Sequence, residues 1–164
     1  MTADSLTIRP ATETDVLLLL DFIRGIAEYE KLLDTVTATE QSLRESLFGD
    51  RPAAEALIGE WDGQPAAYAI YFQNFSTFTG RPGLYLEDIF VKPEYRQRGI
   101  GQKILVHLAQ IAHQRNCPRM EWVALDWNQP AIEFYEKLGA QQLPEWRHFR
   151  MEPPAITALA GTEG

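Results

Sequence analysis

Two adjacent acids interrupt an apolar run near the middle of the sequence. The run covers residues 84–91, and the acids are Glu87 and Asp88. Its length and content predict a buried strand. A carboxylate held in mostly apolar surroundings has a raised pKa, which brings it toward the working range of a general base. This strand is therefore a candidate reaction centre.

Strand alternation separates the two acids. Neighbouring side chains of a strand point to opposite faces, so we expect Glu87 to share its face with Tyr85 and Ile89, and Asp88 to share its face with Leu86 and Phe90. A buried acid is costly unless it is paired or hydrogen-bonded. We expect Asp88, more than Glu87, to be the acid that caps a neighbouring element or pairs with an arginine. Glu87 is then the candidate base.

A basic, glycine-bearing turn follows the strand directly, with the sequence RQRGIG over residues 96–101. It leads into a helical pattern, and backbone N–H groups at a helix N-terminus bind phosphate well. The pattern lacks both the P-loop lysine and the third glycine of a dinucleotide fingerprint. A pyrophosphate on the N–H groups of residues 98–103 is one interpretation, and an ordinary tight turn is the other.

A further candidate lies downstream, in the segment NQPAIEFY that ends at Tyr135. A phenol at this position can pack in the core, which is the commoner fate. Its hydroxyl can instead protonate a leaving group.

Elements must position these residues, and the periodicity of apolar residues predicts them. Strands are expected at 6–9, 54–61, 64–72, 84–91, 120–125 and 146–151, and helices at about 15–29, 40–48, 101–115 and 129–138, with 34–39 and 73–83 as loops. Asp62-Gly63 is a strong hairpin signal. The order predicts an α/β domain with a mixed sheet, whose crossover helix carries the glycine turn.

Composition limits the classes of function. The net charge of −8 argues against a nucleic-acid binder that relies on overall charge. Cys117 is the lone cysteine, so an internal disulfide and a cysteine zinc site are excluded, and a reducing cytoplasm is expected. The N-terminal residues lack the pattern of a signal peptide, and no apolar run approaches the roughly 18 residues of a membrane span.

Three segments together resemble one protein family. The pattern V-x-P-x-x-R-x-x-G-x-G, from Val91 to Gly101, resembles the acetyl-CoA pyrophosphate motif of GNAT N-acetyltransferases, and FYEKLGA resembles the family's second block. The segments YLEDIFV and LDWNQPAIEFYEKLGA, with Tyr29-Glu30, are similar to the diamine branch, which acts on spermidine, spermine or thialysine. The resemblance runs from Ile8 to Met151.

The resemblance implies a fold, a domain and a cofactor. The GNAT fold has a mixed, mostly antiparallel central sheet with a splayed parallel strand pair and helices on both faces. One such domain would cover residues 1–152, and the small, Pro- and Gly-rich composition of 153–164 predicts a flexible tail. Acetyl-CoA would bind without a metal between the splayed strands 84–91 and 120–125. The residues implied in binding it are Ile89, Phe90, Val91, Arg96, Gln97, Arg98, Gly99, Ile100, Gly101, Gln102, Asn128 and Tyr135.

The resemblance also implies a reaction. The amine would attack the thioester directly, without an acetyl-enzyme. Glu87 matches the acid that accepts the amine's proton, through water, and Tyr135 matches the tyrosine that protonates the departing CoA thiolate. Cys117 lies away from this centre, so a cysteine nucleophile is not expected.

The acceptor side is less defined. Tyr29, Glu30 and Glu145 match family positions that contact the polyamine, and Trp146 matches an aromatic wall of the pocket. Acids and aromatic faces suit an ammonium group, although either acid can equally be a solvated surface charge. The segment FSTF at 75–78 stands where polyamine enzymes carry a tryptophan-bearing loop, so the substrate is left open among polyamines, thialysine and other amino compounds.

The sequence also allows two alternative functions. One is protein or peptide N-acetylation, and the other is a non-catalytic acetyl-CoA-binding module. Retention of both Glu87 and Tyr135 favours an enzyme. The resemblance further implies a homodimer, to which the aromatic loop 72–78 could contribute. Neither a nucleic acid nor a membrane is expected as a partner.

Overall fold

The computed structural model describes residues 5–162 of the chain. It has two compact units, Met1–Val123 and Ala124–Gly164. The first unit holds the sheet with helices α1, α2 and α3, and the second holds α4 and α5. Among residues 5–162, no helix is long and apolar enough to cross a membrane.

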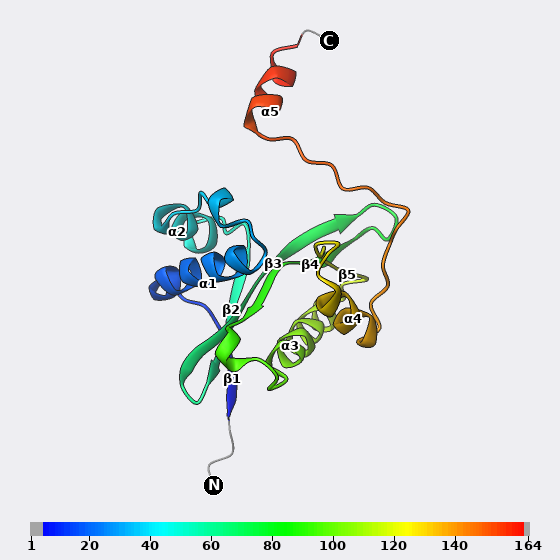
Figure 1. Ribbon diagram of the computed structural model, residues 1–164. Helices are drawn as coiled ribbons and strands as arrows, with labels where there is room; N and C mark the ends of the chain where they lie inside the picture. Colours follow the sequence, from blue (N-terminus) through cyan, green and yellow to red (C-terminus); the bar gives the residue numbers. More distant parts are fainter. Residues whose placement is uncertain (1–4, 163–164) are drawn as a thin grey trace. The chain divides into compact units, whose positions relative to one another are not determined.

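The sheet of the first unit is mixed, as the sequence predicts. Its strands lie side by side in the order β1 (Leu6–Pro10), β2 (Glu55–Trp61), β3 (Gln64–Ser76), β4 (Arg81–Val91) and β5 (Met120–Glu121). The pairs from β1 to β4 are antiparallel, and β4 pairs with β5 in parallel (Figure 1). A mostly antiparallel sheet with one parallel pair confirms the expected fold class.

The β2–β3 hairpin closes at the predicted dipeptide. Asp62 and Gly63 both have positive φ, at 49° and 78°, as a type I′ turn requires. The turn also holds the start of β1, because the backbone N–H of Ser5 donates to Asp62 Oδ1 at 3.0 Å.

The β3–β4 hairpin is longer than predicted. Residues 73–83 were expected to be a loop, and that prediction is wrong. The strands pair from Gln73↔Leu84 out to Ser76↔Arg81. The rings of Phe72 and Tyr85 pack 5.0 Å apart at the base of this extension. Pairing between strands satisfies the backbone hydrogen-bonding groups of polar and glycine-containing segments as well as those of apolar segments. The composition of residues 73–83 alone therefore did not reveal that they form strands.

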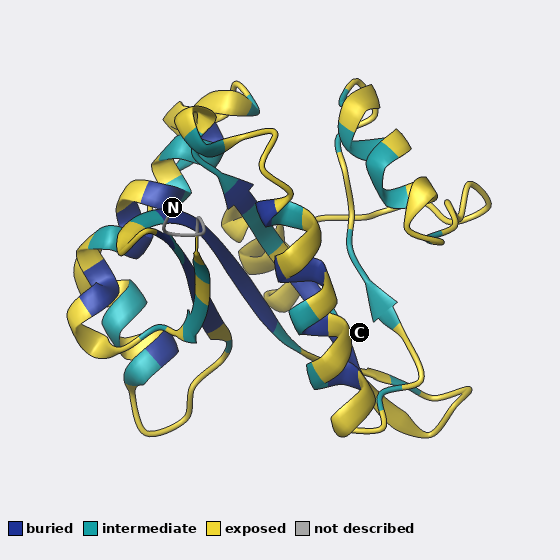
Figure 2. Cartoon of the chain, turned by 90° about the horizontal axis from the view of Figure 1, so that it is seen from below, coloured by how far each residue is buried: buried dark blue, intermediate teal, exposed yellow. Residues whose placement is uncertain are grey.

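Helices cover both faces of the sheet. α1 (Val16–Tyr29) and α2 (Glu40–Phe48) pack on one face, where Leu19, Phe22 and Leu47 form a core cluster with Ile58 and other strand residues. α3 (Ile100–Gln114) packs on the other face, because a Cβ added at Gly59, the neighbour of Ile58, would lie 3.6 Å from Ile104 Cδ1. Figure 2 shows the buried residues along the central strands and on the inward sides of these helices.

Short turns join these elements. The 3₁₀ turns are η1 (Glu13–Asp15), η2 (Leu33–Thr35) and η3 (Pro93–Tyr95). α2 begins with a capping box, in which Ser42 N–H donates to Thr39 Oγ1 at 3.1 Å and Thr39 N–H donates to Ser42 Oγ at 2.9 Å. Thr39 is the N-cap that the sequence predicts.

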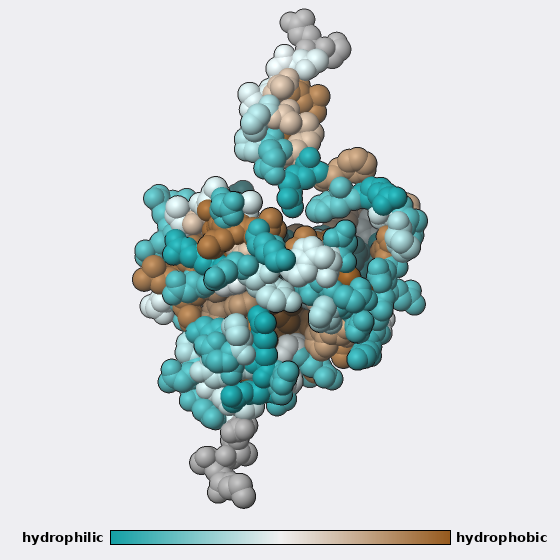
Figure 3. Space-filling view, viewed as in Figure 1, coloured by the Kyte–Doolittle hydropathy of each residue, from teal (hydrophilic) through white to brown (hydrophobic). Residues whose placement is uncertain are grey.

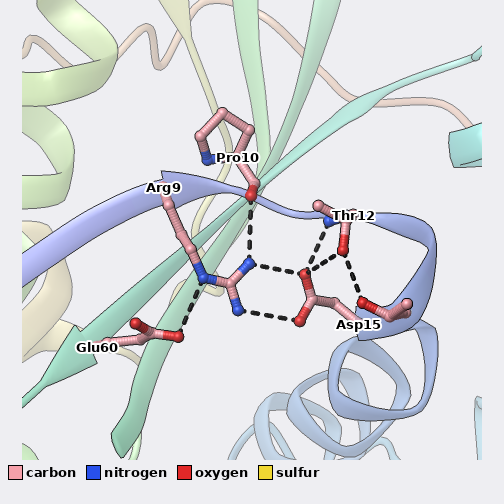
Figure 4. Close-up of polar contacts among 6 residues, drawn as sticks. Arg9, Pro10, Thr12, Asp15 and Glu60 are labelled. Atoms are coloured by element: carbon pink, nitrogen blue, oxygen red, sulfur yellow. Dashed lines mark hydrogen bonds and ion pairs between the residues drawn. The ribbon is translucent and has the colours of Figure 1, made fainter. Parts of the chain in front are cut away.

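An ion-pair network ties the first strand to its neighbours (Figure 4). The guanidinium of Arg9 donates to both carboxylate oxygens of Asp15, at 2.7 and 3.0 Å, and its Nε–H donates to Glu60 at 3.0 Å. Asp15 also accepts from the backbone N–H of Thr12 at 2.7 Å. The Arg9 hydrogen bonds outweigh the effect of burial and hold the pKa of Asp15 at about 2. The network fixes β1 against β2 and against the start of α1.

The second unit contains α4 (Gln129–Lys137) and α5 (Pro153–Ala160). α4 ends as predicted at a glycine: Gly139 has φ 98°. Its N–H donates to the carbonyl of Glu136 at 3.0 Å, and Ala140 N–H donates to that of Tyr135 at 3.1 Å. These two bonds form a Schellman motif.

The predicted last strand is wrong. Residues 146–151 form no strand, and Trp146, Phe149 and Met151 are 70, 87 and 49% exposed. A strand needs a neighbour to receive its backbone hydrogen bonds, and local β-propensity does not supply one. Beyond it, α5 forms inside the segment predicted to be a flexible tail. All of its residues are exposed, and its apolar side chains show on the surface in Figure 3. The flexibility of the tail and a single domain over 1–152 stay predictions.

Candidate active site

A β-bulge lies at the predicted reaction centre. Ile70 and Tyr71 are successive residues of β3, yet they pair with Asp88 and Leu86 of β4. Glu87 is therefore the extra residue of the bulge, and its side chain is exposed. Bulges disrupt the ladder locally and re-aim side chains, often beside active sites. Glu87 is thus placed to meet solvent or a ligand rather than the core.

The bulge changes part of the predicted arrangement of faces. Asp88 and Leu86 lie on opposite faces, because their partners are consecutive residues of β3. Tyr85 and Ile89 also lie on opposite faces, since they pair with Phe72 and Ala69. Asp88 and Phe90 share a face, as predicted, because they pair with Ile70 and Tyr68. The prediction is wrong only across the bulge, where Asp88 does not share a face with Leu86 and Glu87 cannot share one with both Tyr85 and Ile89. Simple alternation fails wherever one strand carries an extra residue.

Asp88 is the satisfied acid, as predicted, but its partner is a tyrosine. Tyr68 Oη donates to Asp88 Oδ2 at 2.7 Å. The Tyr68 side chain is fully buried, and its ring stacks on Phe22 with centroids 5.0 Å apart. Loss of hydration raises the pKa of Asp88, and the bond from Tyr68 partly opposes that rise. Sequence reasoning missed Tyr68, because a tyrosine in an apolar strand has no feature that indicates its partner.

The predicted acceptor residues of the first unit lie at the C-terminal end of α1. Tyr29 is its last residue, 40% exposed, and Glu30 is the half-buried C-cap. Burial and, to a smaller extent, the charge of Asp88 raise the pKa of Glu30. The carbonyl end of a helix also favours cations. This corner of the molecule suits an ammonium group.

The cofactor strand has an open edge. β4 pairs with β5 only at Leu84↔Met120 and Tyr85↔Glu121, and the described part of the chain has no strand beside Leu86–Val91 on that side. Strand β5 is shorter than the predicted 120–125 and ends at Glu121. Ile89, Phe90 and Val91 all belong to this open stretch. Its backbone groups can therefore bind an extended ligand as a further strand would.

The glycine turn has the geometry of an anion site. Gln97 and Gly99 have positive φ, at 63° and 74°, and α3 begins at Ile100. Lys103 N–H makes the bond to Gly99 O at 3.1 Å. The N–H groups of Ile100, Gly101 and Gln102 precede it and have no partner within the helix. Their direction and the helix dipole favour a phosphate.

The side chains of both arginines in the turn contact other groups of the protein. Arg98 lies over the rings of Trp61 and Tyr95, at 5.2 and 5.6 Å, and donates to the carbonyl of Glu94 at 3.4 Å. Arg96 Nε–H donates to the carbonyl of Val91 at 3.1 Å. Arg98 thus holds the turn against β2. The groups that can bind the anion are then the backbone N–H groups at the start of α3.

The remaining predicted residues belong to the second unit. Asn128 occupies the N-cap position of α4, although its side chain makes no capping bond. Tyr135 is half-buried in α4, with its ring 5.6 Å from that of Phe134. Glu145 and Trp146 lie in the irregular segment after α4 and are exposed. The structure thus places Glu87, the open edge, the turn, Tyr29 and Glu30 in one unit. The other unit holds Asn128, Tyr135, Glu145 and Trp146.

Comparisons with known proteins agree with this geometry. The model of the acetyltransferase (GNAT) family matches residues 24–140. A thialysine N-epsilon-acetyltransferase of Sus scrofa is 43% identical over 96% of this chain and 98% of its own. An L-ornithine N5-acetyltransferase of Arabidopsis thaliana is 30% identical over 93% and 86%. An integron cassette protein from V. cholerae has a similar structure, with a TM-score of 0.80, 27% identity, and 96% and 99% of the two chains covered.

The mixed sheet with one parallel strand pair, followed by the glycine turn and α3, agrees with the fold of these acetyltransferases. The chain belongs to the GNAT acetyltransferase family, and the similarity to thialysine acetyltransferases agrees with the diamine branch. It is an acetyltransferase, and enzymes of this family use acetyl-CoA. Within residues 5–162 no cluster of His, Cys, Asp or Glu could hold a metal ion.

Proposed function

We propose that this enzyme transfers an acetyl group from acetyl-CoA to a primary amine of a small substrate that carries a second charged group, as thialysine and the polyamines do. The observation that carries the proposal is the acidic corner at the end of α1. Glu30 lies there, near enough to Asp88 of β4 for the two charges to interact, and the same strand carries the bulged, exposed Glu87. The relatives named for thialysine and ornithine support an acceptor of amino-acid size.

The acyl donor would occupy the open edge and the turn. The backbone of Ile89 would hold the pantetheine arm, and the N–H groups of residues 98–102 would hold the pyrophosphate. The carbonyl of Val91 already accepts from Arg96 at 3.1 Å, so the contribution of Val91 would come chiefly from its N–H. The family resemblance implies a contact with the donor for Asn128 as well. Bound acetyl-CoA supplies an activated thioester.

The reaction would proceed in a ternary complex. Glu87 accepts a proton from the bound ammonium group through a water molecule, which frees the nitrogen lone pair. A C–N bond would then form at the thioester carbon as the C–S bond breaks, and the nitrogen would lose its second proton to solvent to give the neutral amide. Tyr135 delivers its hydroxyl proton to the departing thiolate and regains a proton from solvent. The family resemblance implies amine contacts for Glu145 and Trp146 as well.

A panel assay tests the substrate class. CoA release is measured with spermidine, putrescine, thialysine, ornithine, lysine and a lysine-containing peptide at equal concentrations. We expect the highest kcat/KM among the small amines with two charged groups. Preference for the peptide would replace the proposal with protein acetylation. Acetyl-CoA binding by calorimetry without CoA release on any amine would indicate a binding module.

A further inference from the structure

We infer that Arg96 is a positioning residue for the amine acceptor: it couples the end of α1 to the strand that carries the acyl donor. This inference rests on the proposed function. The sequence motif places Arg96 among the ligands of the pyrophosphate. Its side chain instead contacts the acceptor end of the site.

Three contacts define the position of the Arg96 guanidinium. It lies over the ring of Tyr29 at 4.9 Å and over that of Phe90 at 5.6 Å, and Nε–H donates to the carbonyl of Val91 at 3.1 Å. One planar group thus contacts the last residue of α1 and the last two residues of β4. Lysine cannot reproduce this set, because it lacks the planar fork that stacks and donates at once.

Helix α1 is packed closely against the same ring. A Cβ added at Gly25 would lie 2.9 Å from Phe90 Cε1, so the helix backbone approaches Phe90 nearly to contact. Arg96 extends this contact from Gly25 to the end of the helix at Tyr29. Beyond that point the chain turns sharply, with Lys31 at φ 61°. The position of Tyr29 and Glu30 therefore depends on Arg96.

Arg98 serves as a contrast within the same turn. Its guanidinium contacts Trp61, Tyr95 and the carbonyl of Glu94, and none of these belongs to α1. Loss of the Arg98 side chain should disturb the turn that holds the donor. Loss of the Arg96 side chain should disturb the place of the acceptor. The two arginines thus act on different substrates.

The kinetic test compares Arg96→Met, Arg98→Met and Arg24→Met, the last an exposed position on α1. We expect Arg96→Met to raise the KM of the best amine on the order of tenfold, which corresponds to about 1.4 kcal/mol. The Kd of acetyl-CoA, measured by calorimetry, should change by less than about twofold. Arg98→Met should show the reverse pattern, and Arg24→Met should change neither. A weakened Kd for acetyl-CoA with an unchanged amine KM in Arg96→Met would overturn the inference.

A double-mutant cycle tests the route through Tyr29. Tyr29→Phe keeps the ring and should leave the effect of Arg96→Met intact. Tyr29→Leu removes the ring, and adding Arg96→Met to it should cost much less than in the wild type. Full additivity would contradict the coupling. Arg96→Lys should resemble Arg96→Met.

Hydrogen exchange supplies a readout that does not depend on activity. The amides of Glu30, Lys31 and Leu32 donate to carbonyls of α1, at 2.9, 3.1 and 2.7 Å. Arg96→Met should speed their exchange, whereas Arg24→Met should not. Unchanged exchange would defeat the inference even for an enzyme whose substrate is still unknown. If no amine is acetylated but exchange responds, the proposed function fails and the coupling stands.

Discussion

At the scale of single residues, the two acids of β4 have separate environments. The bulge exposes Glu87, and Asp88 accepts a hydrogen bond from the buried Tyr68. Their separation comes from one extra residue in the strand rather than from alternation. We therefore expect their amide variants to behave differently.

Glu87→Gln should lower kcat/KM most at low pH, where the free amine is scarce and a base matters most.

Asp88→Asn should change the pH dependence of stability instead of the reaction rate. Burial raises the pKa of Asp88, so its contribution to stability is greatest below the ordinary carboxyl pKa and is lost as the pH rises through the raised value. Asparagine still accepts from Tyr68, so Asp88→Asn should not lower the Tm at pH 7. Rate profiles and thermal melts from pH 5 to pH 9 check both expectations; equal kinetic effects in the two variants would contradict the assignment of Glu87.

Tyr135→Phe removes the proposed acid and keeps the ring. Turnover should fall on the order of 10²-fold or more, while the Kd of acetyl-CoA stays nearly constant. Tyr71→Phe, a buried tyrosine of β3, is a matched control and should keep its turnover. Wild-type kcat in Tyr135→Phe would remove its role as an acid.

At the scale of elements, Gly99 and Gly63 allow two effects of a positive-φ glycine to be distinguished: its effect on stability and its effect on acetyl-CoA binding. Gly99 and Gly63 have similar φ, 74° and 78°, and a Cβ added at either would meet no atom within 4 Å. Gly99→Ala and Gly63→Ala should each cost about 1 kcal/mol of unfolding free energy. Only Gly99→Ala should also weaken acetyl-CoA binding, because Gly99 precedes the N–H groups of α3. Equal loss of affinity in both variants would contradict the anion site.

The Arg9–Asp15 pair governs the acid stability of the first elements. The pKa of Asp15 is held at about 2, below the ordinary 3.8. A lowered pKa contributes stability that is present above the ordinary value and lost as the pH falls from about 5 to 2. Arg9 is a third exposed, so Asp15→Asn should cost only about 1–2 kcal/mol at pH 7. Urea titrations at pH 7 and pH 3 measure this; Asp21→Asn, on the exposed side of α1, is the control. A loss that is as large at pH 3 as at pH 7 would argue against the ion pair.

At the scale of the whole molecule, we propose a homodimer that uses the tip of the β3–β4 hairpin. Phe75 and Phe78 are 64 and 91% exposed there, and such aromatic groups are enriched at interfaces. Phe78→Ser should shift light scattering toward the monomer mass at micromolar concentration. Leu17→Ser, 60% exposed on α1, should not. A monomeric wild type would remove the proposal.

The sequence by itself determined the class of the fold, the order of its main elements as far as α4, and the glycine turn, because these depend on local periodicity, positive-φ residues and helix termini. Tertiary structure decided the rest. The bulge at Glu87, the partner of Asp88 and the contact of Arg96 with Tyr29 all join residues that are distant in sequence. The local β-propensity of a segment does not specify which residues of a neighbouring strand it pairs with. The failed strand at 146–151 and the unexpected ladder at 73–84 have the same cause, since a strand exists only where a neighbouring strand receives its hydrogen bonds.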